Sequence, residues 1–205
     1  MLPLSRSIHL SSERPAWQTV LLMAGNLLDL VPVGQLVPRV LVRLNILLVP
    51  ETNPVRGQLR DGPAFVRLGG AAHQVEGSEG DPEMLARQVL DWLNARLQDE
   101  AASEAGSALA REAFARLLAA HIFKDGNGRV ARAVANWLLL RSGFVLRADP
   151  RGYTRCRKEA YYGALGVYPA DAAPWNAFFE DLVAACYEPP RIGSMVAKAR
   201  FEPSG

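Results

Sequence analysis

The stretch from residue 121 to residue 132 combines glycines and charged side chains that could bind phosphate. The tripeptide Gly126-Asn127-Gly128 can adopt positive-φ conformations, which turn successive backbone N–H groups toward one point. We expect Arg129 to begin the helix that follows, whose dipole and free amides favour an anion at the same place. Arg129 and Arg132 lie on one face of that helix, and guanidinium groups form forked contacts with phosphate oxygens. The spacing therefore predicts a polyphosphate site.

Two further side chains of this stretch could act on a bound phosphate. Asp125 lies at the edge of the turn, and a divalent cation that bridges phosphates commonly takes a single protein carboxylate. His121 ends the preceding predicted helix and can take up a proton near neutral pH. Each residue alone has an ordinary explanation, because a histidine can cap a helix and Gly-Asn-Gly is often a plain turn. Their coincidence favours a functional site.

Two common nucleotide-binding motifs do not explain the stretch. Residues 126–131 fit the dinucleotide fingerprint G-x-G-x-x-[G/A], with Asp149 about twenty residues further on. That fingerprint must follow a strand, whereas residues 110–120 have apolar side chains at helical spacing, so we reject a Rossmann fold. The chain contains no G-x-x-x-x-G-K-[ST], which excludes a P-loop.

The same stretch resembles the Fic family. It matches the signature H-x-F-x-[D/E]-G-N-G-R-x-x-R at every fixed position, and no packing requirement calls for that ordered set. The family usually carries proline after the histidine, where this chain has Ile122. The matching residues are His121, Phe123, Asp125, Gly126, Asn127, Gly128, Arg129 and Arg132.

The resemblance implies an all-α, mainly helical Fic fold with a small β-hairpin flap and an active-site loop between two central helices. It also implies a protein adenylyltransferase, which transfers AMP from ATP to a Ser, Thr or Tyr hydroxyl of a target protein and releases diphosphate. His121 would be the general base, and Asp125 would hold Mg²⁺ between the α- and β-phosphates. Residues 126–128 would cradle the phosphates, Arg129 would neutralise the β- and γ-phosphates, and Arg132 would contact the γ-phosphate.

Three aromatic residues have roles that follow only from the resemblance. Phe123 would point into the core and hold the loop in place. Tyr161 or Tyr162 could contact the adenosine, and packing in the core is the alternative for both rings.

Other activities remain open at this point. Some Fic relatives transfer UMP, phosphocholine or the γ-phosphate of ATP, and a nucleotide-binding interaction module without transfer is a further alternative. Gly128 and both motif arginines favour the orientation that transfers AMP. Basic residues beyond them, Arg151 included, are interpreted as a solvated surface.

Hydrophobic periodicity predicts the elements that position the stretch. Asp81 and Pro82 begin a helix, with proline at its first position and an apolar face that includes Met84. Strands over 64–68 and 71–75 flank a Gly69-Gly70 turn and form a hairpin. The other predicted helices cover residues 17–30, 36–48, 103–120, 129–142, 152–165 and 171–187.

The chain is predicted to have three parts: a helical extension over 1–54, a Fic domain over 55–188 and a flexible tail over 189–205. The hairpin, at about 57–76, would be the flap on which an extended target segment docks as an added strand. Many Fic enzymes carry an inhibitory helix [S/T]-x-x-x-E-[G/N], which is absent here. Three alternatives remain for the control of the activity: a separate antitoxin-like protein, another form of regulation, or action without restraint as a secreted effector.

With 205 residues and 49% hydrophobic content, the chain can bury one substantial core. A net charge of +2 points to no partner, and we expect neither a nucleic-acid nor a membrane partner. The apolar run over 16–49 is interrupted by charges and prolines, and the N-terminus lacks signal-peptide features. Cys156 and Cys186 need not pair. These features favour a cytoplasmic location.

Overall fold

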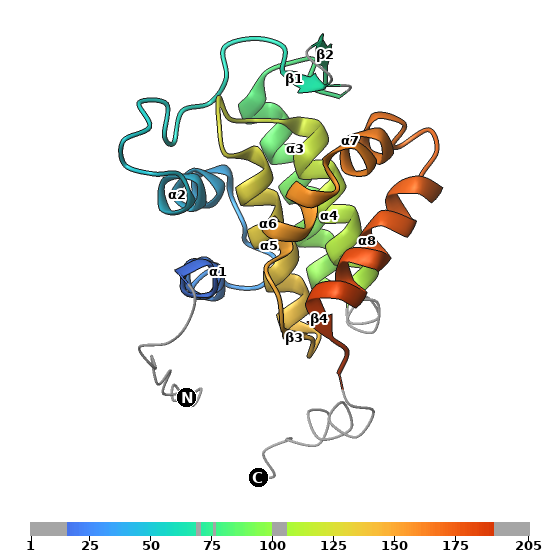
Figure 1. Ribbon diagram of the computed structural model, residues 1–205. Helices are drawn as coiled ribbons and strands as arrows, with labels where there is room; N and C mark the ends of the chain where they lie inside the picture. The colour runs from blue at the N-terminus through green and yellow to red at the C-terminus, as the bar shows by residue number, and fades with distance from the viewer. Residues whose placement is uncertain (1–15, 69–70, 76, 100–105, 191–205) are drawn as a thin grey trace.

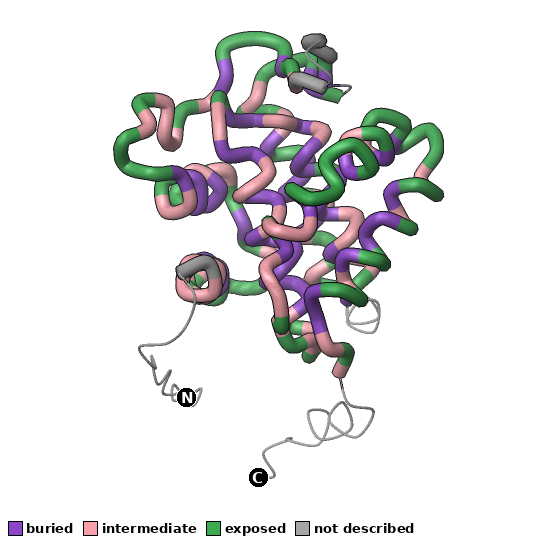
Figure 2. Tube along the Cα trace, in the orientation of Figure 1, coloured by how far each residue is buried: buried purple, intermediate pink, exposed green. Residues whose placement is uncertain are grey.

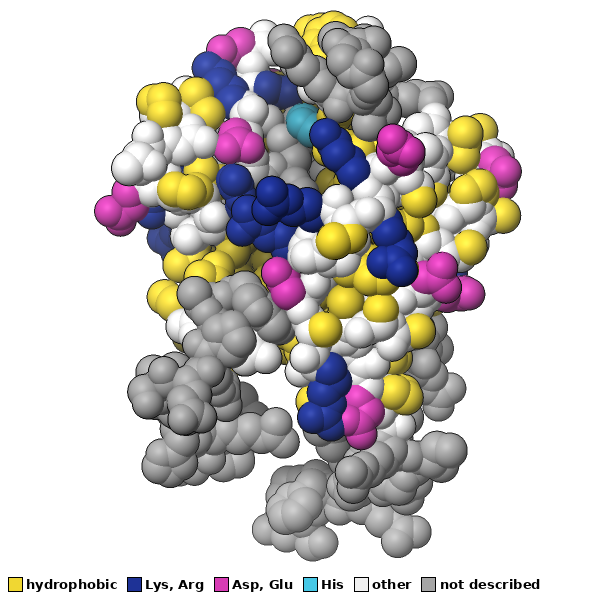
Figure 3. All heavy atoms as spheres, viewed as in Figure 1, with side chains coloured by type: hydrophobic (Ala, Val, Ile, Leu, Met, Phe, Trp, Pro, Cys, Tyr) yellow, Lys and Arg dark blue, Asp and Glu magenta, His cyan; other side chains and the backbone are white. Residues whose placement is uncertain are grey.

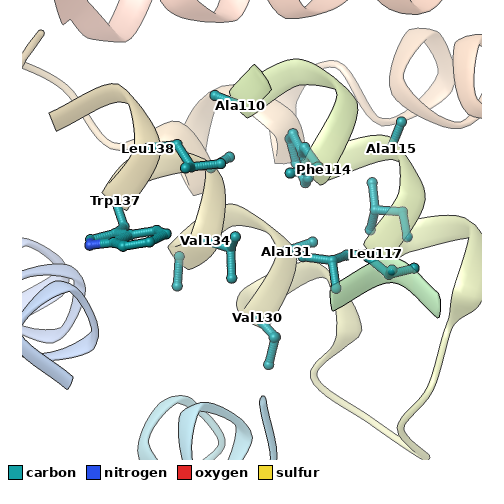
Figure 4. Close-up of a cluster of buried hydrophobic side chains, with 14 of the residues drawn as sticks. Ala110, Phe114, Ala115, Leu117, Val130, Ala131, Val134, Trp137 and Leu138 are labelled. Carbon is teal, nitrogen blue, oxygen red and sulfur yellow. The ribbon is translucent and has the colours of Figure 1, made fainter. Parts of the chain in front are cut away.

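Two antiparallel helices, α4 (Gly106–Ala120) and α5 (Asn127–Arg141), form the centre of the fold (Figure 1). The computed structural model describes residues 16–68, 71–75, 77–99 and 106–190. The contacting faces of α4 and α5 are rich in alanine, which lets the two backbones approach closely around larger side chains such as Phe114 and Val134 (Figure 4). Buried residues are concentrated along both helices (Figure 2).

The remaining helices surround this pair and bury its other faces. On one side, α1 (Ala16–Asp29) and α2 (Pro38–Leu48) pack against α5. On the other, α3 (Pro82–Gln98) and α8 (Ala173–Cys186) pack against α4. Two short helices, α6 (Pro150–Cys156) and α7 (Lys158–Gly166), pack on α8.

The strands form two small antiparallel sheets. In the hairpin, β1 (Phe65–Leu68) pairs with β2 (Ala71–Gln74) in a register that places Phe65 opposite Gln74. In the second sheet, β3 (Val145–Leu146) pairs with β4 (Tyr187–Glu188) and ties the end of α8 to the segment after α5. The predicted fold class, a mainly helical fold with a small hairpin, is confirmed.

Several local predictions need correction. The helix predicted over 152–165 is two helices with a break at Arg157, because this lets Tyr153 and Tyr161 both pack on Phe178, at ring-centroid distances of 5.9 and 5.5 Å. Met84 does not lie on a buried apolar face as predicted, because it is 47% exposed near the start of α3. The pairing of β3 with β4 was not foreseen.

Other predictions are confirmed or lie outside the described residues. Asp81 caps α3 by accepting a bond from the Met84 amide at 2.8 Å, and Gly143 ends α5 with φ 87°. The Gly69-Gly70 turn and most of the predicted tail lie outside the described residues, and the boundary at residue 54 stays a prediction. Both cysteines are free, and none of the described helices is long and apolar enough to cross a membrane.

Candidate active site

His121 directly follows α4 and has a left-handed backbone, with φ 42°. Its amide bonds to the Leu117 carbonyl at 3.3 Å, the hydrogen bond that closes a helix with a left-handed residue. Glycine normally fills that position, and another residue there costs about 1–2 kcal/mol. The turn directs the chain away from α4 and places His121 on a cavity of about 270 Å³.

Hydrogen bonds within the loop after His121, and others to the segment before the hairpin, hold this loop in place. Ile122 and Phe123 are 2% and 1% exposed, so the structure places Phe123 in the core. The Asn127 side chain accepts a bond from the Phe123 amide at 2.9 Å and donates one to its carbonyl at 2.8 Å. The Lys124 amide donates to the Gln58 carbonyl at 3.1 Å. The side chain of Asn127 thus holds both backbone groups of Phe123.

The two motif glycines differ in conformation. Gly126 precedes α5 with φ 88°, and a Cβ there would lie 2.5 Å from Val49 Cγ2 and 2.7 Å from Asn45 Nδ2. Gly128 lies inside α5, which begins at Asn127, so the positive φ predicted for Gly128 and the helix start predicted at Arg129 are wrong. The side chain of Asn127 makes the earlier start favourable, because it links the first helical turn to Phe123.

Asp125 presents its carboxylate at the mouth of the turn. Its Oδ1 accepts the Gly126 amide at 2.6 Å, and its Oδ2 accepts Asn53 Nδ2 at 2.7 Å and Arg129 Nη1 at 3.3 Å. The side chain is still 44% exposed. The described residues contain no group of three metal-ligating side chains, so a cation here would need ligands from a substrate. One exposed carboxylate beside phosphates is the set that Mg²⁺ commonly takes, and Asp125 fits it.

Three arginines line a second cavity, of about 250 Å³, between the start of α5 and the N-terminal helices: Arg129, Arg132 and Arg151. Burial lowers the pKa of the Arg132 guanidinium, and the charges of Arg151 and Arg129 lower it further. Of the residues that the structure describes, Asp149 is the only carboxylate on this cavity, and it also accepts the Arg151 amide at 2.9 Å. Lys and Arg side chains gather near a histidine on this face of the molecule (Figure 3). The cavity therefore suits an anion.

The cavity beside His121 is lined by residues of α4, α5, α7 and the hairpin, including Gly128, Tyr161 and Tyr162. Tyr161 is 5% exposed and also packs on Phe114 and Trp175, so it belongs to the core as well as to the cavity wall. Tyr162 is half-buried, with its ring centroid 4.8 Å from that of Tyr161. Aromatic rings on a partly apolar wall suit a flat base.

Burial lowers the pKa of His121. A hydrogen bond from the imidazole to the backbone carbonyl of Leu118 opposes that shift, the Arg60 charge adds to it, and the Asp125 charge opposes it. The lowered pKa favours the neutral imidazole, which is the form that can accept a proton.

Four residues of the site lay outside the sequence prediction: Asn45, Asn53, Arg60 and Arg151. Asn45, which is fully buried, donates to the Asp125 carbonyl at 2.8 Å and accepts the Gly57 amide at 2.7 Å. A polar residue inside the apolar pattern of 36–48 was the available signal for Asn45. Nothing in the sequence distinguished Arg151 from its basic neighbours.

The chain is similar to known proteins in its sequence. The family model described as Fic/DOC family matches residues 35–139. Protein adenylyltransferase Fic of Drosophila willistoni is 30% identical over 102 residues, which are 50% of this chain and 19% of that protein. The chain thus spans about a fifth of that relative's length.

Three solved structures are similar in fold. The N-terminal Fic domain of a VirB-translocated Bep effector protein from Bartonella quintana has a TM-score of 0.56 and 21% identity, covering 89% of this chain and 84% of that one. Fic-1 (residues 134–508) from C. elegans has a TM-score of 0.56 and 20% identity, covering 92% and 55%. BepC from Bartonella tribocorum, with bound AMPPNP, has a TM-score of 0.51 and 18% identity, covering 85% and 86%.

Proposed function

The chain belongs to the Fic/DOC family, and we propose that it is a protein adenylyltransferase that transfers AMP from ATP to a hydroxyl of a target protein. One observation carries the proposal: two cavities flank the start of α5, one lined by His121 and two tyrosines, the other by three arginines. A nucleotide laid across Gly128 would have its base on one side and its terminal phosphates on the other. The adenylyltransferase name of the Drosophila relative and the AMPPNP bound to BepC support ATP as the donor.

The base and the terminal phosphates would each have a distinct environment. Tyr162 and the edge of Tyr161 would contact the adenine, with Leu165 on the same wall. Arg129, Arg132 and Arg151 would bind the β- and γ-phosphates, and the amides at the start of α5 would face the phosphates between these two regions. With the phosphates in that order, the α-phosphorus would be the one near His121.

His121 would start the reaction as a neutral base. It would accept the proton of the target hydroxyl while that oxygen attacks the α-phosphorus, so that one P–O bond forms as the bond to diphosphate breaks. The start of α5 and the arginines would stabilise the charge that develops on the phosphates and on the leaving diphosphate. Mg²⁺ held by Asp125 and the phosphates would supply further neutralisation of charge.

The hairpin would present the target. Val66 and Gln74, one from each strand, line the cavity of His121, so a segment added to this sheet would pass close to the imidazole. Main-chain pairing holds an extended peptide with little dependence on its sequence. Selection of the target would then rest on surfaces outside the hairpin.

We also propose that α1 does not inhibit the site. Among the residues that the structure describes, the α1 side chains on the arginine cavity are Val20 and Leu21, and neither brings a carboxylate to the arginines. Transfer activity that appears only when residues 16–29 are deleted would contradict this.

The function is tested by searching a lysate for peptides that gain AMP when the purified protein, ATP and Mg²⁺ are added. We expect AMP on Ser, Thr or Tyr of a small set of proteins, and none when His121→Ala replaces the parent. Phosphate, UMP or phosphocholine on those peptides would instead identify another transfer reaction. Modification that persists in EDTA would show that the transfer does not require Mg²⁺.

A further inference from the structure

Arg60 binds three consecutive carbonyl groups at the turn that carries His121. Its Nε donates to the His121 carbonyl at 2.9 Å and its Nη2 to the Ala120 carbonyl at 3.4 Å. Its backbone amide donates to the Ile122 carbonyl at 3.1 Å. We propose that Arg60 is a positioning residue, which fixes the left-handed backbone of His121 and thereby aims the imidazole at the reacting hydroxyl.

The environment of Arg60 indicates that this is its main role. The residue is 7% exposed, and its Nη1 donates to the Gly62 carbonyl at 2.5 Å. Within the described part of the chain, no carboxylate forms an ion pair with Arg60. A buried guanidinium needs hydrogen-bond acceptors, and here backbone carbonyls of the turn and of its own loop supply them.

The turn needs such a support. The last carbonyls of a helix lack partners within the helix, and a left-handed residue other than glycine is strained. Arg60 satisfies the carbonyls at the end of α4 and places its positive charge at the negative end of the helix dipole. The strained conformation at His121 therefore persists because a residue 61 positions away in the sequence holds it.

The charge of Arg60 acts on the same imidazole. Arg60, from the loop before the hairpin, favours neutral His121, whereas Asp125, from the motif turn, favours the charged form. The other polar side chains on the His121 cavity carry amide or hydroxyl groups: Gln74 of β2, and Tyr161 and Tyr162 of α7. Removal of Arg60 should therefore raise the pKa of His121 as well as loosen its backbone.

The test separates hydrogen bonding from charge with Arg60→Lys and Arg60→Met. Lysine keeps the charge but replaces the planar fork that reaches several carbonyls. Because this inference rests on the proposed function, two readouts are needed: kcat and KM for ATP in AMP transfer, and the NMR titration of His121, assigned with His121→Asn. The matched control is Arg56→Met, since Arg56 lies in the same loop but bonds to the Ile46 carbonyl at 2.6 Å.

We expect both Arg60 variants to lower kcat on the order of 10²-fold while KM for ATP stays close to the parent value, as a misplaced catalytic group does. Only Arg60→Met should raise the pKa that His121 shows by NMR. A kcat in both Arg60 variants equal to that of Arg56→Met would overturn the proposal. It would also be overturned if, in Arg60→Lys, kcat and KM changed together and folded protein was lost. If the parent shows no AMP transfer, the proposed function fails. The NMR readout then still tests the positioning role, because a His121 resonance at the same chemical shift in Arg60→Lys and in the parent would overturn it.

Discussion

The side chain of Asn127 closes a ring with the backbone of Phe123, bonding to its amide at 2.9 Å and to its carbonyl at 2.8 Å. This pair fixes the loop between His121 and the turn at Gly126. Loss of either bond would leave a buried backbone group of Phe123 without its partner.

Asn127→Ala should lower the free energy of unfolding by about 1–3 kcal/mol, the usual cost of leaving buried polar groups unsatisfied. Denaturant unfolding would measure it, with exposed Asn26→Ala of α1 as the control. A change no larger than that of the control would show that the ring with Phe123 does not hold the loop.

Gly126→Ala should be destabilising by more than 1 kcal/mol, because alanine is strained at φ 88° and its Cβ would meet Val49 at 2.5 Å. Gly163→Ala is the matched control, since a Cβ there has nothing within 4 Å and the position is helical. That control should be stabilising by up to about 1 kcal/mol. Equal unfolding midpoints for the two variants would contradict the geometry of the turn.

Arg151→Ala should weaken ATP binding about fivefold, the effect of one exposed charge contact of about 1 kcal/mol. AMP, which lacks the terminal phosphates, should bind the variant and the parent alike. Calorimetry in low salt would measure both ligands, with exposed Arg155→Ala as the control. Equal losses for ATP and AMP would place Arg151 away from the phosphates.

Stability should depend on pH through His121. Burial lowers its folded-state pKa below the usual value of 6.5, so the unfolded chain binds the proton more readily as the pH falls through that value. The parent should therefore lose stability relative to His121→Ala as the pH falls below 6.5, and the two should respond alike above it. Thermal unfolding across that range would measure the difference, and parallel curves throughout would contradict the shift.

The motif and most helices could be predicted because they are local in sequence. Apolar residues at helical spacing and the end signals Pro82 and Gly143 indicated where elements lie. The support of the site could not be predicted in this way. Asn45 and Arg60 reach the motif from 80 and 61 residues away, and the break at Arg157 depends on packing against α8.

The conformation of His121 illustrates the same limit. Its residue type indicated a base. That this histidine, and not a glycine, adopts the left-handed conformation follows only from the contacts that enclose the turn. The motif therefore indicated which groups could react, while the surrounding loops determine where they point.

The central claim is that the α-phosphorus of ATP lies beside His121, and a paired labelling assay tests it most directly. The purified protein is incubated with Mg²⁺ and a lysate, with ATP labelled at either the α- or the γ-phosphate. The account predicts protein labelling from the α position alone, with a loss of about 10²–10⁴-fold in His121→Ala while ATP binding persists. Label from the γ position, or equal labelling by His121→Ala and the parent, would contradict it.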